Sequence, residues 1–169
     1  MKKKLNVGCG DLKFEDCLNI DINKDCNPDL VWDCNRIPYP FINGWFDEII
    51  SIHSLEHLNN PTEVLNEWKR ILKDDGIIRL RLPHCSCAIG HTPEHKTSWN
   101  YHSWILEDRG FKVKKIKLSF LREHPIINKF VNPFLNIAPR YYERFLCWIF
   151  PCAEIVIELQ KKIKEQKEQ

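Results

Sequence analysis

Two glycines and two aspartates near the start of the chain have the residue types and spacing of a nucleoside-binding site. A short apolar run leads into Gly8-Cys9-Gly10, and a second run, residues 18–20, leads into Asp21. Glycines after a strand let the backbone approach a ligand closely. A carboxylate at the end of the next strand can accept hydrogen bonds from both hydroxyls of a ribose. Asp33, after a third short run, can accept a hydrogen bond from an exocyclic amine such as that of adenine.

The link between the glycines and the second run is too short and too polar for the usual crossover helix. A dinucleotide requires a helix N-terminus for its pyrophosphate, and its fingerprint has a third glycine and an acidic residue about 20 positions further on. Here the third glycine is absent and Asp21 follows sooner. A ligand with adenine and ribose but no phosphate needs neither feature. We therefore expect S-adenosylmethionine as the cofactor and disfavour a nicotinamide dehydrogenase.

Histidines supply the residue types for proton transfer, because imidazole can act as a general base near neutral pH. Our candidates are His53, His84, His91 and His95. Three of them lie in the unusual stretch PHCSCAIGHTPEH, residues 83–95, together with Cys85 and Cys87. A Cys-x-Cys pair without a second pair nearby is not a strong zinc pattern, so we expect no metal. This stretch is either a loop that contacts the acceptor or a polar loop without a special task.

The elements that must position these residues follow from apolar periodicity. Strands are expected at residues 5–8, 18–22, 29–33, 46–52, 77–82, 111–118 and 154–159, and helices at 61–73, 98–108 and 140–150. Strands that alternate with helices predict a mostly parallel sheet, whose ligand lies beyond the carboxyl ends of the strands. The last strand alternates in polarity, which suits an edge position. Residues 119–139 contain three prolines and are expected to be irregular.

Several segments together resemble a known family. They are NVGCG (6–10), LNID (18–21), Asp33 followed by IPY (37–39), FDEII (46–50), HSLEHL (53–58) and EWKRILKDDG (67–76). In this order and spacing they resemble the class I S-adenosylmethionine-dependent methyltransferases, specifically the compact methyltransferase-11-like group. The resemblance covers residues 5 to about 83, with a weaker match at 104–113 and the final strand. It implies an α/β, Rossmann-like class I methyltransferase sheet, mostly parallel with an antiparallel last strand, and helices on both faces.

The resemblance also implies roles for individual residues. The glycine segment 8–10 would lie beneath the methionine and ribose. Asp21 would hold the ribose hydroxyls, with Ile22 against the adenine, and Asp33 and Cys34 would hold the amine edge of the adenine. The full set of expected cofactor-binding residues is Asn6, Gly8, Cys9, Gly10, Asp21, Ile22, Asp33, Cys34, Ser51 and His53.

Length and composition limit the class of protein. A chain of 169 residues predicts a single domain, 1–169, with an aromatic and proline-containing insertion at about 119–150 before the last strand. A net charge of +2 with dispersed basic residues does not favour a nucleic-acid partner. We see no signal peptide and no window apolar enough to span a bilayer, so we expect a cytoplasmic protein whose eight cysteines are thiols. Residues 134–151 combine aromatics with arginines, so they either pack on the sheet as a helix or contact a membrane surface.

The function expected from these features is methyl transfer from S-adenosylmethionine to a small-molecule or carbohydrate or glycan-type acceptor. Such a displacement needs the acceptor atom in line with the methyl group and the sulfur, so positioning does most of the work. The alternative is a non-catalytic protein that uses the fold as a binding module or scaffold. A transfer-RNA methyltransferase is disfavoured because the chain lacks a basic stripe and an Asn-Pro-Pro-Tyr-type motif after the fourth strand. The sequence does not determine the oligomeric state.

Overall fold

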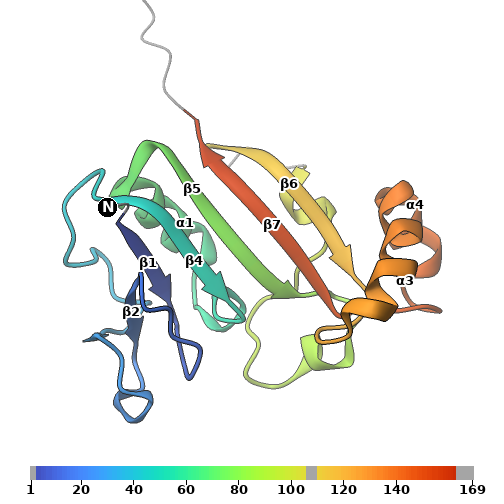
Figure 1. The fold of residues 1–169 in the computed structure, drawn as a ribbon, viewed down its shortest axis with the longest axis horizontal. Helices are drawn as coiled ribbons and strands as arrows, with labels where there is room; N and C mark the ends of the chain where they lie inside the picture. Colours follow the sequence, from blue (N-terminus) through green and yellow to red (C-terminus); the bar gives the residue numbers. More distant parts are fainter. Residues whose placement is uncertain (1–2, 106–109, 163–169) are drawn as a thin grey trace, which may run out of the picture.

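The computed structural model describes residues 3–105 and 110–162, which contain one seven-stranded sheet of order β3-β2-β1-β4-β5-β7-β6 (Figure 1). The strands are β1 Lys4–Val7, β2 Leu18–Asp21, β3 Leu30–Val31, β4 Phe46–Ile52, β5 Leu72–Pro83, β6 Phe111–Ser119 and β7 Glu154–Lys161. Neighbours among β1 to β5 pair in parallel, whereas β7 is antiparallel to both β5 and β6. The expected fold class, a mostly parallel α/β sheet with an antiparallel last strand, is confirmed.

The expected edge position of the last strand is wrong, because β7 lies between β5 and β6. Its alternation has another cause. Ile155, Ile157 and Leu159 face the buried core, whereas Val156 and Glu158 lie half-buried on the other face of the sheet. The edge belongs to β6, whose exposed lysines discourage pairing with another strand.

Helix α1, Pro61–Ile71, forms as expected at its start. Asn60 Oδ1 accepts a hydrogen bond from Glu63 N at 3.3 Å, and proline occupies the first turn. The buried stripe of the helix contains Val64, Leu65, Trp68 and Ile71, and it packs on one face of the sheet (Figure 1). The helix ends two residues earlier than the expected 61–73, and β5 begins directly at Leu72 instead of residue 77, because Leu72 pairs with Phe46 of β4.

The segments after β5 differ most from expectation. Helix α2, His102–Ile105, covers only part of the expected 98–108, of which residues 106–109 lie outside the described residues. Helix α3, Pro125–Ile137, occupies the stretch expected to be irregular. Helix α4, Pro139–Tyr141, and a π-helical turn, Tyr142–Leu146, replace the single helix expected at 140–150.

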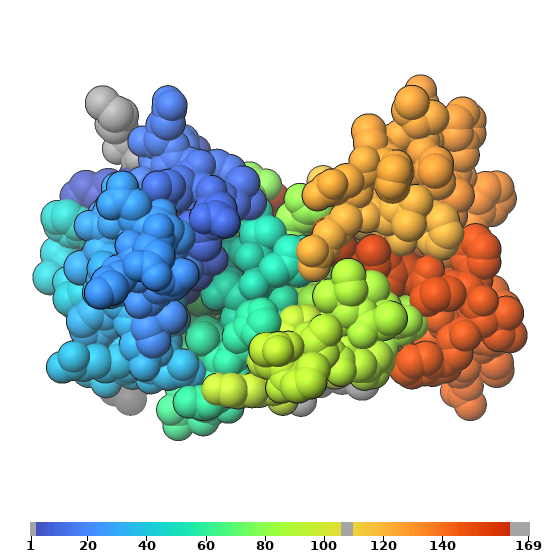
Figure 2. Space-filling view, turned by 90° about the horizontal axis from the view of Figure 1, so that it is seen from below, coloured from blue at the N-terminus to red at the C-terminus, as the bar shows by residue number. Residues whose placement is uncertain are grey.

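Helix α3 packs against the edge strand β6 (Figure 1), and Figure 2 shows the segment that contains it standing apart from the N-terminal part of the chain. A hollow separates α3 from residues 11–27 (Figure 2). The lining of this hollow includes Phe14 together with Ile52 of β4 and Val156 of β7. Among the described residues, no helix has the length and apolar character needed to cross a membrane.

Candidate active site

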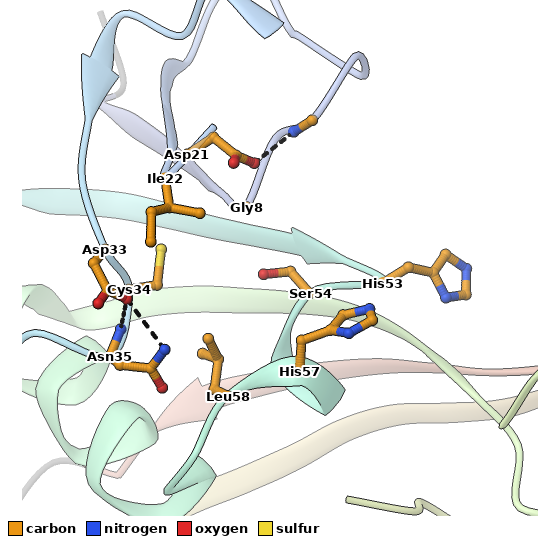
Figure 3. Close-up of a pocket in the computed structure, with 11 residues that line it drawn as sticks. Gly8, Asp21, Ile22, Asp33, Cys34, Asn35, His53, Ser54, His57 and Leu58 are labelled. Atoms are coloured by element: carbon orange, nitrogen blue, oxygen red, sulfur yellow. Dashed lines mark hydrogen bonds between the residues drawn. The ribbon is translucent and has the colours of Figure 1, made fainter. Parts of the chain in front are cut away.

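The carboxyl ends of β1, β2 and β4 surround a pocket of about 370 Å³ (Figure 3). Its lining residues are Gly8, Gly10, Asp21, Ile22, Asp33, Cys34, Asn35, His53, Ser54, His57 and Leu58. The volume lies within the range of small-molecule sites. Seven of the ten residues expected to bind the cofactor therefore line one pocket: Gly8, Gly10, Asp21, Ile22, Asp33, Cys34 and His53.

The glycine turn needs glycine for two reasons. Gly8 and Gly10 have left-handed backbone angles, with φ of 64° and 48°. Gly8 also lies directly against Ser54, so a Cβ added at Gly8 would collide with the serine side chain. Gly8 N and Cys9 N both donate to the Ile20 carbonyl, at 2.9 and 3.0 Å, which ties the turn to the end of β2.

Asp21 holds the same turn from the opposite side. Its Oδ2 accepts a hydrogen bond from Gly10 N at 2.8 Å, and its Oδ1 accepts one from Asn23 N at 2.8 Å. An ionised carboxylate has about four acceptor sites, so these two bonds leave capacity for a pair of hydroxyls. The carboxylate is thus both oriented and able to bind a ribose diol.

Asp33, Cys34 and Asn35 form the far wall of the pocket (Figure 3). Asp33 Oδ1 accepts from Asn35 N at 2.9 Å and from Asn35 Nδ2 at 3.1 Å, which fixes the direction of the carboxylate. Burial raises the pKa of the Cys34 thiol to about 12, so the thiol is neutral at physiological pH and acts as a small apolar surface.

Three expected cofactor ligands do not line the pocket, namely Asn6, Cys9 and Ser51. Asn6 Nδ2 donates to Leu12 O at 2.8 Å and to Asn19 Oδ1 at 3.0 Å, so its amide holds the loop between β1 and β2. The side chains of Cys9 and Ser51 are buried. Contact between these three residues and a cofactor stays a prediction.

His53 is the catalytic candidate that lines the pocket. It has a left-handed φ of 51°, and its Nε2 lies 3.3 Å from Oε1 of the fully buried Glu154. Its Nδ1 lies 3.1 Å from Arg122 Nη2 and 3.5 Å from Glu56 Oε1. Burial alone would lower the pKa of His53, but the hydrogen bond with Glu154 and the nearby Glu56 carboxylate outweigh it and raise the pKa above its usual value.

Glu154 is the anion behind His53. Burial would raise its pKa, but His53 and Arg81 lower it, and Arg81 donates to Oε2 at 3.0 and 2.6 Å. The carboxylate is therefore ionised at neutral pH and favours the protonated form of His53. This makes His53 better suited to orient a polar group or donate a proton than to remove one.

The structure places the other three candidate bases outside the pocket lining. His84 is fully buried between Ser86 Oγ at 2.8 Å and Glu143 Oε1 at 3.0 Å. His91 is exposed, and its Nε2 lies 2.6 Å from Cys85 O. His95 lies beside Glu56, with its ring centroid 4.6 Å from that of His57.

Four lining residues were not expected as ligands: Asn35, Ser54, His57 and Leu58. The last three follow β4, where the 3-10 helix Leu55–His57 turns the chain back over the pocket. The segment HSLEHL could have predicted Ser54, His57 and Leu58 as lining residues, because it directly follows a strand whose end faces the ligand.

Comparison with known proteins agrees with this geometry. Residues 5–80 match the family profile described as a methyltransferase domain, of the methyltransferase-11 type. A search of the curated proteins finds no match to the chain.

Solved structures show similarity over nearly the whole chain at low identity. A Haloferax volcanii complex between the Trm112 methyltransferase activator and its methyltransferase aligns with a TM-score of 0.69 and 15% identity, covering 98% of this chain and 84% of the other. An S-adenosylmethionine-dependent methyltransferase from Archaeoglobus fulgidus aligns with a TM-score of 0.67 and 19% identity, covering 95% and 86%. The [4+2]-cyclase SpnF aligns with a TM-score of 0.64 and 15% identity, covering 96% and 76%. Residues 5–80 thus match a methyltransferase domain of the methyltransferase-11 type, and the chain has the fold of the class I S-adenosylmethionine-dependent methyltransferases.

Proposed function

We propose that the pocket binds S-adenosylmethionine and that the protein transfers its methyl group to a small-molecule or glycan-type acceptor. The observation that carries this proposal is Asp21, which is oriented by Gly10 N and Asn23 N at one wall of a pocket of about 370 Å³. Bound S-adenosylmethionine supplies an electrophilic methyl group. The residues of this chain bind and orient the reactants and exclude water.

Each wall of the pocket suits one part of the cofactor. Asp21 would bind the ribose hydroxyls, and the exposed side chain of Ile22 offers an apolar surface for the adenine ring. Asp33 and Asn35 present an acceptor and a donor to the amine edge of the ring. The opposite wall, with His53 and His57, would then face the methyl group and the acceptor (Figure 3).

We propose the acceptor class from the polar side chains at the wall that contains His53 and His57. The imidazole of His53 and the guanidinium of Arg122 lie 3.1 Å apart at its edge. Hydrogen-bonding groups of this kind suit an acceptor rich in hydroxyls better than an apolar one. A non-catalytic binding role is the competing reading, and the cyclase among the similar structures shows that the fold by itself does not define the reaction.

Calorimetric titration with S-adenosylmethionine and S-adenosylhomocysteine tests the proposal. We expect binding in the micromolar range, weakened at least about tenfold in Asp21→Ala, because hydrogen bonds to a charged group contribute about 1.5–3 kcal/mol. Asp25→Ala is the matched control, since Asp25 is an exposed acid on the same segment. A folded wild-type protein that binds neither ligand would refute the enzyme function, and equal binding by Asp21→Ala would refute the assigned site.

We also propose that this enzyme works at an anionic membrane surface. Along α3, Ile126, Phe130, Phe134 and Ile137 are 75%, 68%, 74% and 77% exposed. The apolar surface continues through Tyr141, Phe145, Trp148 and Ile149. Exposed cations interleave with these side chains, namely Lys129, Arg140 and Arg144, whereas Glu143 binds inward to His84 and His102. An apolar face bordered by basic residues is the composition of a membrane-interface segment.

A further inference from the structure

Three side chains at the edge of the pocket form a group that none of the proposed cofactor contacts includes as a whole. Glu56, His57 and His95 each bring one ligand atom within 4.8 Å of the other two. Glu56 and His57 are neighbours in the 3-10 helix Leu55–His57, whereas His95 comes from the loop that follows β5.

The backbone holds this loop against Glu56. Lys96 N and Thr97 N both donate to the Glu56 carbonyl, at 2.8 and 3.2 Å. His95 is thereby fixed beside the carboxylate by main-chain bonds that do not involve its own side chain. A site built from two anchored segments is pre-organised for a ligand.

The carboxylate of Glu56 is buried without a hydrogen-bond partner among the described residues. The residue is 1% exposed, and within the described chain neither carboxylate oxygen has a hydrogen-bond partner. The nearest cationic groups to Oε1 are His53 Nδ1 at 3.5 Å and His95 Nε2 at 4.0 Å, both beyond good hydrogen-bond distance. Burying a carboxylate in this way is costly unless a cation or a donor occupies the space beside it.

One of the two imidazoles, His57, is held as metal-ligating histidines usually are. His57 Nδ1 lies 3.1 Å from the Glu94 carbonyl, which can only accept, so Nδ1 donates and Nε2 is the nitrogen left to bind a metal. A ligating histidine typically donates its other N–H to a backbone carbonyl in this manner. His95 Nδ1 is buried and lacks a hydrogen-bond partner in the described residues, while its Nε2 faces Glu56.

We propose that Glu56, His57 and His95 bind a divalent transition-metal ion. Two imidazoles and a carboxylate favour zinc over magnesium or calcium, which prefer oxygen ligands. Three protein ligands leave a fourth position open, as in catalytic zinc sites. Because His57 also lines the pocket, an ion held here would lie at the wall that faces the acceptor.

Cobalt titration tests this site. After removal of metal with a chelator, the reduced protein is titrated with Co²⁺, with visible absorption reporting binding and near-ultraviolet absorption reporting sulfur ligation. We expect about one equivalent to bind without a sulfur-to-cobalt band, although the chain contains eight cysteines. His95→Ala should weaken binding at least about tenfold. His91→Ala, an exposed histidine of the same loop, should leave binding unchanged.

A second variant separates loss of the metal from loss of the fold. Glu56→Gln removes a buried charge that lacks hydrogen bonds, so the metal-free variant should melt at or above the wild-type temperature. Added Zn²⁺ should raise the melting temperature of the wild type and leave that of Glu56→Gln unchanged. Absence of Co²⁺ binding, a sulfur band at the first equivalent, or equal binding by His95→Ala and His91→Ala would each overturn the site. None of these measurements requires S-adenosylmethionine, so the site can fail while the proposed function stands.

Discussion

Glu143 is the residue that fastens the segment before β7 to the rest of the molecule. Its Oε1 lies 3.0 Å from His84 Nε2, and its Oε2 lies 2.7 Å from His102 Nδ1. The backbone N–H of Tyr101 also donates to Oε1. One carboxylate thus joins the end of β5, the start of α2 and the π-helical turn.

Replacing this carboxylate should produce a pH-dependent loss of stability. Burial would raise the pKa of Glu143, but the bonds from His84, Tyr101 N and His102 lower it below its usual value. A lowered pKa means that the stabilisation is present above about pH 4.5 and is lost as the pH falls through the folded-state pKa. We expect Glu143→Gln to lower the free energy of unfolding by about 1–3 kcal/mol at pH 7, with a smaller difference below about pH 4. Urea denaturation followed by tryptophan fluorescence at both pH values measures this.

The control for this substitution is Glu123→Gln, because Glu123 is an exposed acid before α3. It should leave the free energy of unfolding within about 0.5 kcal/mol of wild type. A Glu143→Gln difference that is the same at both pH values would show that the charge of Glu143 does not contribute.

The sequence predicted correctly which residues line the pocket where these residues lie at the carboxyl ends of strands. Gly8, Asp21 and Asp33 follow strand ends that meet at one edge of a parallel sheet, and all three line the pocket. Asn6 lies within β1 and Ser51 at the penultimate position of β4, before the strand ends, and neither lines the pocket. The pairing of Glu56 with His95 was not predictable, because it depends on how a long loop folds back.

Helix α3 illustrates, at the scale of elements, how an edge strand is covered without another strand. Its asparagines recur every four residues and therefore share one face of the helix: Asn128, Asn132 and Asn136. Asn136 Oδ1 accepts from Leu118 N at 2.9 Å, and its Nδ2 donates to Leu118 O at 2.8 Å. Asn132 Oδ1 accepts from Phe120 N at 2.8 Å, and Asn128 bonds both backbone groups of Leu121.

Removing one of these amides should loosen the edge locally. We expect Asn136→Ala to lower the free energy of unfolding by about 1–2 kcal/mol, because two backbone groups of Leu118 lose their partner. The amide hydrogen of Leu118 should exchange faster, as measured by hydrogen exchange with NMR detection. Lys129→Ala, on the exposed side of the same helix, should change neither quantity. Unchanged exchange at Leu118 would show that the asparagine face does not protect the strand.

The elements that the sequence did not predict have identifiable causes. Three prolines suggested an irregular segment, yet Pro125 occupies the first turn of α3 and Pro139 the first turn of α4, where proline is tolerated. Pro133 lies inside α3, although a proline there removes a backbone hydrogen bond, so its position argued against a helix. The long apolar strands and the capped helix α1 were predictable because their local patterns and their burial agree.

The whole molecule separates the pocket from an exposed apolar surface. The pocket lies at the ends of β1, β2 and β4, whereas the apolar surface of α3 and residues 141–150 lies beyond β6, at the opposite edge of the sheet (Figure 1). The position of β7 between β5 and β6 depends on how the chain connects the strands. The alternation of apolar and polar residues along one strand does not reveal its neighbours, so β7 was wrongly expected at an edge. The mostly parallel arrangement was predicted from an alternation of strands and helices, although among the first five strands, all within the described residues, the α-helix is α1, between β4 and β5.

Binding to lipid vesicles tests the proposed membrane surface at this scale. We expect the protein to float with phosphatidylcholine vesicles that contain phosphatidylserine and to bind pure phosphatidylcholine less, with salt weakening the difference. The double variant Phe130→Ser and Phe134→Ser should lower the partition coefficient at least about tenfold, because burying one large apolar side chain contributes about 1.5–3 kcal/mol. Ile42→Ser is the control, since Ile42 is 64% exposed and lies in the loop before β4. Equal flotation of the double variant and the control would refute membrane binding by this surface.

Analytical ultracentrifugation tests the other occupant. If the wild type forms dimers and the double variant is monomeric, the surface binds a second copy of the chain instead of lipid.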